Sequence, residues 1–176
     1  MRLSTKGEYA SRAMLELALN RRPGALHIRD ISAAQEIPRR FLEQILLSLK
    51  RAGYLRSKKG PNGGYFLAKP ASQITVAEII RVMDGPLAPI DCVSVTAHQV
   101  CARERYCGLK WLWKEVRDAV AEIMERTTFE DLARTTQAAK EAKESKAARA
   151  GLKGAKKKSG PSGTAGFPKK RSLIID

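Results

Sequence analysis

The sequence is short of long apolar runs, of aromatic residues and of acidic charge. No apolar run approaches the roughly 20 residues that a membrane-spanning helix needs. Glu8, Glu16 and Asn20 interrupt the first apolar stretch, which excludes a signal peptide. We therefore expect a cytoplasmic protein with no membrane partner. Aromatic residues make up only 6% of the chain, which favours a helix-rich fold over a β-sandwich.

The sequence also has few residues with catalytic chemistry. It has two histidines and three cysteines, no Cys-x-x-Cys pair, and no recognisable Ser/His/Asp set. A redox enzyme would need a positioned base beside its cysteine, so we do not expect an enzyme. All three cysteines lie between Cys92 and Cys107, and an odd, tightly spaced set argues against a disulfide framework.

Positive charge, by contrast, is abundant. Lys and Arg number 33 against 18 Asp and Glu, a formal net charge of +15. Residues 140–176 hold 11 basic and 3 acidic residues, so the remainder carries 22 and 15, a net +7. Such an excess indicates a polyanionic partner such as nucleic acid. Residues 138–176 have too few apolar residues to form a core and are expected to form a mostly disordered basic tail, with a helix only at its start. This tail either adds DNA affinity or only solubilises the chain.

The first half of the chain has the order of a winged helix-turn-helix. A helix is expected to about Asn20, opened by a Thr5–Glu8 capping box, and a short helix over residues 28–35 follows. A third helix begins at Pro38 and ends near Arg51. Residues 54–57 and 65–67 then predict a β-hairpin with a glycine-rich tip. Residues 1–85 are thus predicted to be a DNA-binding domain, mainly α with a small β-hairpin.

The second half is predicted to carry the sensing and pairing parts. Thr75 and Glu78 cap a fourth helix that Gly85 ends, and residues 86–108 form an irregular segment, the cysteine loop. A long helix over 109–126 has apolar residues at steps of three and four, a pattern typical of a dimerisation seam. A last helix is expected from Thr128 to Leu132, within a dimerisation and C-terminal segment of residues 109–137. The seam residues are Leu109, Leu112, Val116, Ala119 and Ile123.

Exposed polar residues near the start of the third helix are predicted to read DNA. This helix fits the major groove, where Arg pairs with guanine, Gln with adenine, and Glu accepts from cytosine. The basic hairpin tip suits a narrow minor groove, where the negative potential is enhanced. The predicted DNA-binding residues are Lys6, Arg39, Arg40, Glu43, Gln44, Lys58, Lys59 and Gly60. Each could instead belong to a solvated helix face, and the prediction depends on their order in the motif.

The cysteines have the spacing C-x8-C-x5-C, which predicts a metal site. Cys92, Cys101 and Cys107 lie on one loop, so three thiolates could hold one side of a metal centre and leave a fourth position to another ligand. Zinc sites usually contain C-x2-C pairs, which are absent here. Three unbound cysteines remain the alternative.

Four segments resemble the winged-helix transcriptional regulator family of IscR, NsrR, RirA and CymR. They are Met1–Ala10, Phe41–Leu46, Lys59–Tyr65 and Cys107–Trp113, and the likeness extends over about residues 1–135. The resemblance implies a homodimer joined through the long helix and bound to a palindromic operator in double-stranded DNA. It also implies that the region around Glu43 tunes operator choice and that the three cysteines hold an iron–sulfur cluster, either 2Fe–2S or 4Fe–4S.

The fourth cluster ligand departs from the family pattern. Where the cluster regulator has a His three residues after its last cysteine, this chain has Lys110, a poor ligand while protonated. His98 lies in the loop but is more typical of a solvated side chain, and His27 precedes the second helix. In the nitric-oxide-sensing branch an acidic residue at the position of Glu8 ligates the cluster from the partner subunit. We therefore interpret Glu8 as the fourth ligand, with the capping box as its competing role.

Two other functions remain open from the sequence. A winged-helix regulator could sense through cysteine oxidation or zinc without a cluster and still share the DNA-reading half. A non-specific nucleic-acid-binding protein could depend on the basic tail alone. The favoured hypothesis is a sequence-specific repressor whose operator binding is controlled by an iron–sulfur cluster and by its reaction with nitric oxide, oxygen or iron shortage.

Overall fold

The computed structural model describes residues 3–20, 24–60 and 63–156, with side chains as far as residue 147. This part is mainly helical with one antiparallel hairpin, which confirms the predicted fold class. By internal contacts the chain divides into two units, residues 1–138 and 139–176. The helices are α1 (Thr5–Leu19), α2 (Ile28–Gln35), α3 (Arg39–Arg51), α4 (Val76–Asp84), α5 (Gly108–Arg126) and α6 (Phe129–Lys156), and the strands are β1 (Leu55–Lys58) and β2 (Gly64–Leu67).

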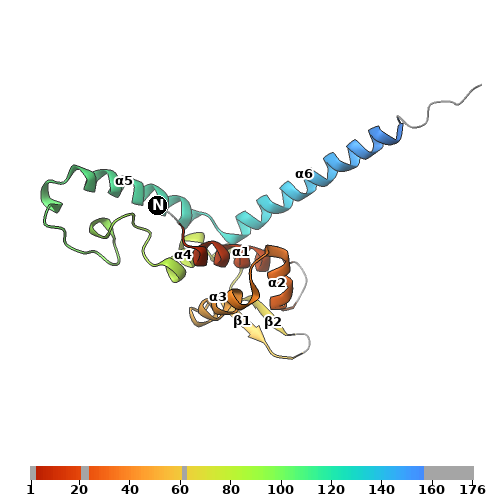
Figure 1. Cartoon of the computed structure of the whole chain (residues 1–176), viewed down its shortest axis with the longest axis horizontal. Coiled ribbons are helices and arrows are strands. Elements are labelled where there is room, and N and C mark those ends of the chain that lie inside the picture. The colour runs from red at the N-terminus through yellow and green to blue at the C-terminus, as the bar shows by residue number, and fades with distance from the viewer. Residues whose placement is uncertain (1–2, 21–23, 61–62, 157–176) are drawn as a thin grey trace, which may run out of the picture. The chain divides into compact units, whose positions relative to one another are not determined.

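Helices α1, α2 and α3 and the β1–β2 hairpin gather at one end of the first unit (Figure 1). The predicted apolar stripe of α3 is buried, because residues at steps of three and four share one helix face. The turn from α2 to α3 is tight: Glu36 adopts φ 52°, and the Ser32 hydroxyl donates to the Ile37 carbonyl at 2.7 Å. The buried α3 residues are Leu42, Ile45, Leu46 and Leu49.

The start of α1 differs from the sequence-based prediction. Ser4 is the N-cap, and its hydroxyl accepts the backbone N–H of Gly7 at 3.0 Å. The predicted Thr5–Glu8 capping box is therefore wrong. Adjacent Ser and Thr residues offer two capping registers, and a distant contact selects between them, because the Ser4 N–H donates to Asp84 Oδ2 at 3.0 Å.

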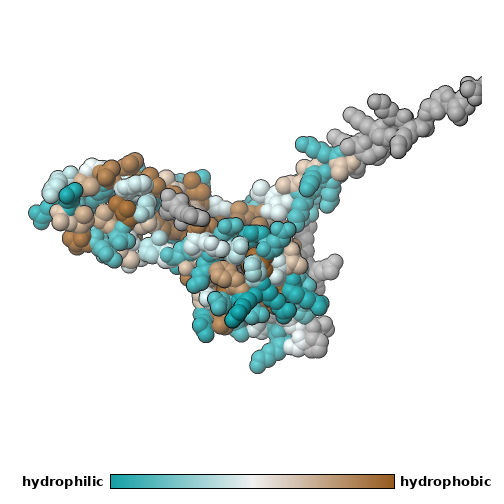
Figure 2. All heavy atoms as spheres, in the orientation of Figure 1, coloured by the Kyte–Doolittle hydropathy of each residue, from teal (hydrophilic) through white to brown (hydrophobic). Residues whose placement is uncertain are grey.

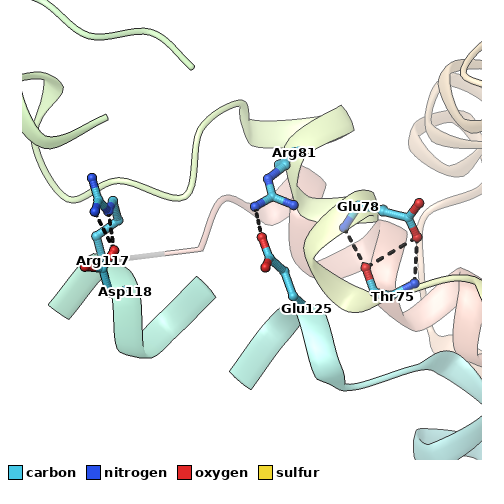
Figure 3. Close-up of polar contacts among 6 residues, drawn as sticks. All are labelled: Thr75, Glu78, Arg81, Arg117, Asp118 and Glu125. Atoms are coloured by element: carbon cyan, nitrogen blue, oxygen red, sulfur yellow. Dashed lines mark hydrogen bonds and ion pairs between the residues drawn. The ribbon is translucent and has the colours of Figure 1, made fainter. Parts of the chain in front are cut away.

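The capping box predicted at the start of α4 is confirmed. Thr75 Oγ1 accepts from the Glu78 N–H at 3.3 Å, and the Thr75 N–H donates to Glu78 Oε2 at 2.8 Å (Figure 3). Two backbone donors that a helix end would leave without a partner are thus satisfied.

Helix α6 begins in contact with the segment before α4. The Phe129 N–H donates to the Ile74 carbonyl at 3.0 Å, and the Phe129 ring is fully buried. Thr128 and Asp131 form the same reciprocal bonds as a capping box: the Thr128 N–H donates to Asp131 Oδ2 at 3.1 Å, and Thr128 Oγ1 accepts from the Asp131 N–H at 3.2 Å. Phe129 therefore enters the core on a rigid helix start.

Two hydrophobic clusters organise the first unit. The larger one contains buried residues of α1, α3 and α4 together with Phe129, and within the described residues the segment 85–128 contributes no side chain to it. The smaller one, made of Ala77, Ile80 and Leu87, packs against Met124 of α5. The Arg81–Glu125 ion pair also joins α4 to α5 (Figure 3). Helix α5 thus packs against α4 and Leu87 through the smaller cluster and contributes no side chain to the larger one.

The cysteine loop follows α5 from the end of α4 and leads into the first residue of α5, Gly108 (Figure 1, green). It contains two short 3₁₀ turns, η2 (Asp91–Val93) and η3 (Glu104–Tyr106). The η2 turn is held against α5 by Arg117, whose guanidinium donates to the Val93 carbonyl. Val93 and Ser94 are buried in consequence, although most of the loop is exposed.

Helix α6 is much longer than predicted. The sequence indicated a helix ending near Leu132 and a mostly disordered tail after residue 138, yet the helix continues to Lys156. Ala, Lys and Glu dominate this stretch and are among the strongest helix formers, so propensity accounts for the extension. The remainder of the predicted tail, residues 157–176, lies outside the described residues. None of the described helices combines the length and the apolar character that crossing a bilayer requires.

Candidate functional site

The start of α3 presents the predicted reading residues to solvent. Arg39, Arg40, Glu43 and Gln44 are all exposed, because the opposite face of the helix is buried in the core. Arg39 Nε lies 3.8 Å from Glu43 Oε1, an i,i+4 ion pair at the surface. Such exposed pairs are weak and exchange readily for contacts with a nucleic acid.

The hairpin is anchored to the segment before α2. Tyr65 and Leu26 exchange two backbone hydrogen bonds, of 2.8 and 2.9 Å. Gly64 has φ +151°, and an added Cβ would lie 2.1 Å from the Leu26 carbonyl oxygen, so only glycine fits there. The anchored hairpin carries the exposed residues Lys58, Lys59 and Gly60, while Pro61 and Asn62 of the predicted tip lie outside the described residues.

A cationic hollow of about 380 Å³ lies between α2, α3 and the hairpin. Arg29, Arg39, Lys58 and His27 line it together with backbone of the glycine-rich hairpin, and none of its described lining residues is acidic. A phosphate oxygen there would meet positive charge from three elements at once. Sequence reasoning missed Arg29 and His27, since only the fold brings the start of α2 beside the hairpin. Lys6 is exposed in the first turn of α1 and does not line this hollow.

The three cysteines form no disulfide with one another and occupy different environments. Cys92 lies in η2 and Cys107 is the N-cap of α5, both half-buried, while Cys101 is exposed. Within the part of the chain that is described, no three His, Cys, Asp or Glu side chains are grouped closely enough to hold a metal ion. Three thiols on one loop suit an iron–sulfur cluster by donor chemistry, but this single chain does not bring them together with a fourth donor.

Glu104 contacts both His98, the histidine of the cysteine loop, and Lys110, which occupies the position of the family's ligating His. Lys110 Nζ donates to Glu104 Oε1 at 2.8 Å, and His98 Nε2 lies 3.1 Å from the same oxygen. These contacts, the Lys110 bond foremost, lower the pKa of Glu104 to about 2. Lys110 and His98 are thus engaged by a carboxylate, a role that no short sequence motif indicates.

Glu8 is exposed and accessible. Its side chain is 58% exposed, and its carboxylate lies 3.7 Å from Arg12 on the next turn of α1. Because Ser4 caps the helix, Glu8 has no capping role to compete with another function. It does not join a group of metal-binding side chains within the described chain.

Helix α5 exposes most of its predicted seam. Leu109, Leu112 and Ile123 are 62%, 53% and 53% exposed, and the helix buries no residue. Apolar side chains gather over this helix in Figure 2. A contiguous exposed apolar stripe on a helix typically marks an interaction surface.

The chain matches known proteins over this whole arrangement. A family model described as "Rrf2: Iron-dependent Transcriptional regulator" matches residues 3–135. The chain belongs to the Rrf2 family of transcriptional regulators. The regulator CymR of Bacillus subtilis is 36% identical over 141 residues, which cover 80% of this chain and 96% of CymR. This Rrf2 chain is therefore a DNA-binding transcriptional regulator, and the relatives named here are regulators rather than enzymes.

Solved structures of two family members resemble this Rrf2 chain. The structure of B. subtilis CymR, called there the global cysteine regulator, has a TM-score of 0.63 at 35% identity and covers 77% of this chain and 98% of that one. T. potens IscR has a TM-score of 0.65 at 28% identity, covering 79% and 90%. Each likeness covers less than four-fifths of this chain.

Proposed function

We propose that this Rrf2 regulator is a cytoplasmic, homodimeric repressor that reads a palindromic operator and is controlled through an iron–sulfur cluster on Cys92, Cys101 and Cys107. In this proposal, base edges are read from α3 and the hairpin contacts the minor groove. A dimer with two-fold symmetry requires two half-sites related by the same symmetry.

The cationic hollow between α2, α3 and the hairpin is the observation that carries the DNA-reading part. Arg29, Arg39 and Lys58 bring positive charge to one concave surface, and no acidic side chain lines it within the described residues. Phosphate contacts fix the register of a protein on the duplex. Arg40, Glu43 and Gln44 then remain for base edges on the adjacent turn of α3.

The exposed stripe on α5 supports the dimer. Leu109, Leu112 and Ile123 would lose their contact with water against a second copy of the same helix. Burial of apolar surface stabilises association by roughly 25 cal/mol per Å² before the entropy cost of association is subtracted. A two-fold axis pairs each stripe with itself, so one apolar surface serves both subunits.

The sensing part depends on the donor chemistry of the cysteine loop. Cys92, Cys101 and Cys107 would supply three thiolates, and the exposed Glu8 of the other subunit would supply a carboxylate. A bound cluster would supply iron that is reactive toward nitric oxide and oxygen, held most weakly on the carboxylate side. Lys110 would then balance the negative charge of Glu104 beside the cysteine loop.

A second candidate is a regulator that senses by thiol oxidation or zinc without a cluster. The arrangement of the loop favours it, since the described cysteines are not gathered at a metal-ready site and Cys101 is exposed to oxidants. The similarity to a protein called the global cysteine regulator is in line with it.

Anaerobic purification separates the two candidates. The cluster proposal predicts a brown protein with broad visible absorption that changes on addition of nitric oxide, and loss of the colour in Cys101→Ala. A colourless protein with bound zinc, or one with reversible Cys101 oxidation and no iron, would favour the second candidate.

Selection of bound sequences from random DNA tests the reading residues. A palindromic consensus is expected, and Gln44→Ala should relax specificity at one position of each half-site, about 5- to 150-fold for the loss of one bidentate contact. Lys58→Gln should weaken all sequences alike and reduce the salt slope by about 1. Gln99→Ala and Arg126→Gln, which alter exposed residues away from the hollow, are the matched controls. Absence of any consensus would contradict sequence-specific reading.

A further inference from the structure

A second cavity lies between the cysteine loop and α5. Its volume is about 530 Å³, within the range of small-molecule sites. The loop contributes Cys92, Val93 and Ser94 to one wall, and α5 contributes Trp111 and Lys114 to the other. The DNA-reading proposal uses neither wall.

The cavity is strongly cationic. Arg105, Lys110, Lys114 and Arg117 line it, and Glu104 is the one acidic residue in its described lining. Lys110 is paired with Glu104, and Arg117 with Asp118 on the same helix (Figure 3). Lys114 makes only a long contact of 3.7 Å to Asp118, with its side chain 48% exposed.

Arg105 has no counter-charge. Within the described residues it makes no hydrogen bond or ion pair, although it lies at the rim of a cavity lined by three further cations. Arg105 and Lys114 thus hold positive charge that the chain does not neutralise well. A bound anion would meet both, in a hollow partly shielded from bulk water.

The cavity and the apolar stripe occupy opposite faces of α5. An α-helix advances about 100° per residue, so Lys114 lies about 180° from the centre of the apolar stripe, and Lys110 and Arg117 lie about 140° and about 120° from it. The stripe is formed by Leu109, Leu112, Val116, Ala119 and Ile123. The apolar contact of the proposed dimer would therefore be made by a face of α5 that does not line the cavity.

We propose that this cavity binds a small organic dianion that combines a phosphate monoester or two carboxylates with a flat apolar group. Arg105 and Lys114 contact the charged end. Val93 and the Trp111 indole, which supply apolar surface to the same cavity, contact the apolar end. Because the ligand would bridge loop and helix, its binding would hold the Cys92 turn against α5.

Calorimetric titration of the full chain at fixed ionic strength tests this proposal. The probes are phenyl phosphate, phenylmalonate and inorganic phosphate. We expect one saturable site per chain for at least one phenyl probe, bound at least several-fold more tightly than inorganic phosphate. Binding of only one phenyl probe assigns the ligand to phosphate esters or to dicarboxylates. No saturable binding of either phenyl probe, or equal binding of inorganic phosphate, would overturn the proposal.

Two variants locate the site. Arg105→Gln and Lys114→Gln should each weaken the bound probe about tenfold, as expected for loss of one charge-assisted contact. Arg103→Gln, an exposed loop cation outside the cavity lining, and Arg126→Gln at the far end of α5 should bind as the natural chain does. Equal affinity in all four variants would contradict this location.

Thiol alkylation of protein prepared free of iron gives a readout that depends neither on DNA nor on a cluster. Cys92 lines the cavity and Cys101 does not, so a saturating probe should slow alkylation of Cys92 several-fold and leave Cys101 unchanged. Unchanged Cys92 reactivity would contradict the site. The calorimetric titration and the alkylation of Cys92 can be interpreted even if the protein binds no operator and assembles no cluster. The anion site and the proposed function can therefore fail independently.

Discussion

Asp84, the last residue of α4, binds Ser4, the N-cap of α1. The Ser4 N–H donates to Asp84 Oδ2 at 3.0 Å, and the Ser4 hydroxyl donates to Asp84 Oδ1. The same hydroxyl accepts from Gly7, so one serine joins the cap of α1 to the end of α4. Asp84 directly precedes Gly85, where the chain turns toward the cysteine loop with φ +83°. The loop and the reading domain therefore meet at this contact.

Asp84→Ala should lower the free energy of unfolding by about 1 kcal/mol, because two hydrogen bonds to Ser4 are lost at an exposed site. Chemical denaturation followed by circular dichroism measures it. Glu115→Ala, an exposed acidic residue on α5, is the control and should stay within about 0.5 kcal/mol of the natural chain. Equal stability of the two variants would show that the contact contributes nothing.

Gly7→Ala should destabilise the protein although alanine is the better helix former. An added Cβ would lie 2.6 Å from Asp84 Oδ2 and 3.1 Å from Leu3 Cδ1, so Asp84 must move away from Ser4. Gly108→Ala is the matched control, since Gly108 also lies in the first turn of a helix and has no neighbour within 4 Å. Thermal unfolding should place Gly7→Ala below the natural chain and Gly108→Ala at or above it.

The Asp84 contact also shows where sequence reasoning ends. The apolar stripe of α3 and the Thr75–Glu78 box were predictable because they depend on residues a few positions apart. The choice of Ser4 over Thr5 depends on a residue 80 positions away, which no local pattern contains. The extent of α6 was misjudged for another reason: low apolar content was interpreted as disorder, whereas helix propensity alone sustains the Ala- and Lys-rich stretch.

Leu112→Glu should convert the proposed dimer into a monomer without unfolding the chain. Leu112 is 53% exposed in the single chain, so its change costs the monomer little, while a carboxylate in the seam would be buried against its own copy. Light scattering coupled to size exclusion gives the mass. Lys114→Glu, on the opposite face of α5, should remain dimeric. A Leu112→Glu protein that keeps the mass of a dimer would place the interface elsewhere.

Asp131→Ala should weaken the start of α6 above pH 4 and have less effect in acid. Hydrogen bonds from Thr128 lower the pKa of Asp131 below its ordinary value of 3.8. A carboxylate with a lowered pKa stabilises the fold above the unfolded-state value and loses that effect as the pH falls through the folded-state value. The difference between the melting temperatures of the natural chain and of Asp131→Ala should therefore be constant above about pH 5 and shrink as the pH falls below 3.8.

Glu130→Ala is the control for this pH series, because Glu130 is an exposed neighbour in the same turn. Its melting temperature should follow that of the natural chain at each pH. A gap for Asp131→Ala that stays constant down to pH 3 would contradict the role of its charge.

The candidate site was predictable in part. The reading residues of α3 were named from their place in the motif, and their exposure agrees with that prediction without testing their role. The positions of Arg29 and His27 in the hollow, and the Glu104 contacts with Lys110 and His98, depend on how irregular segments fold back. Periodicity does not constrain such segments, so their partners become visible only in three dimensions.

Among the residues that the structure describes, the segment 85–128 contributes no side chain to the main hydrophobic core. Residues in this segment can therefore change in number, spacing or chemistry during evolution while the main core of the reading domain stays intact. Old operators can stay in use while a new signal is acquired, because the two properties draw on separate sets of residues. That separation gives a physical reason why a family described as iron-dependent regulators also includes a protein called the global cysteine regulator.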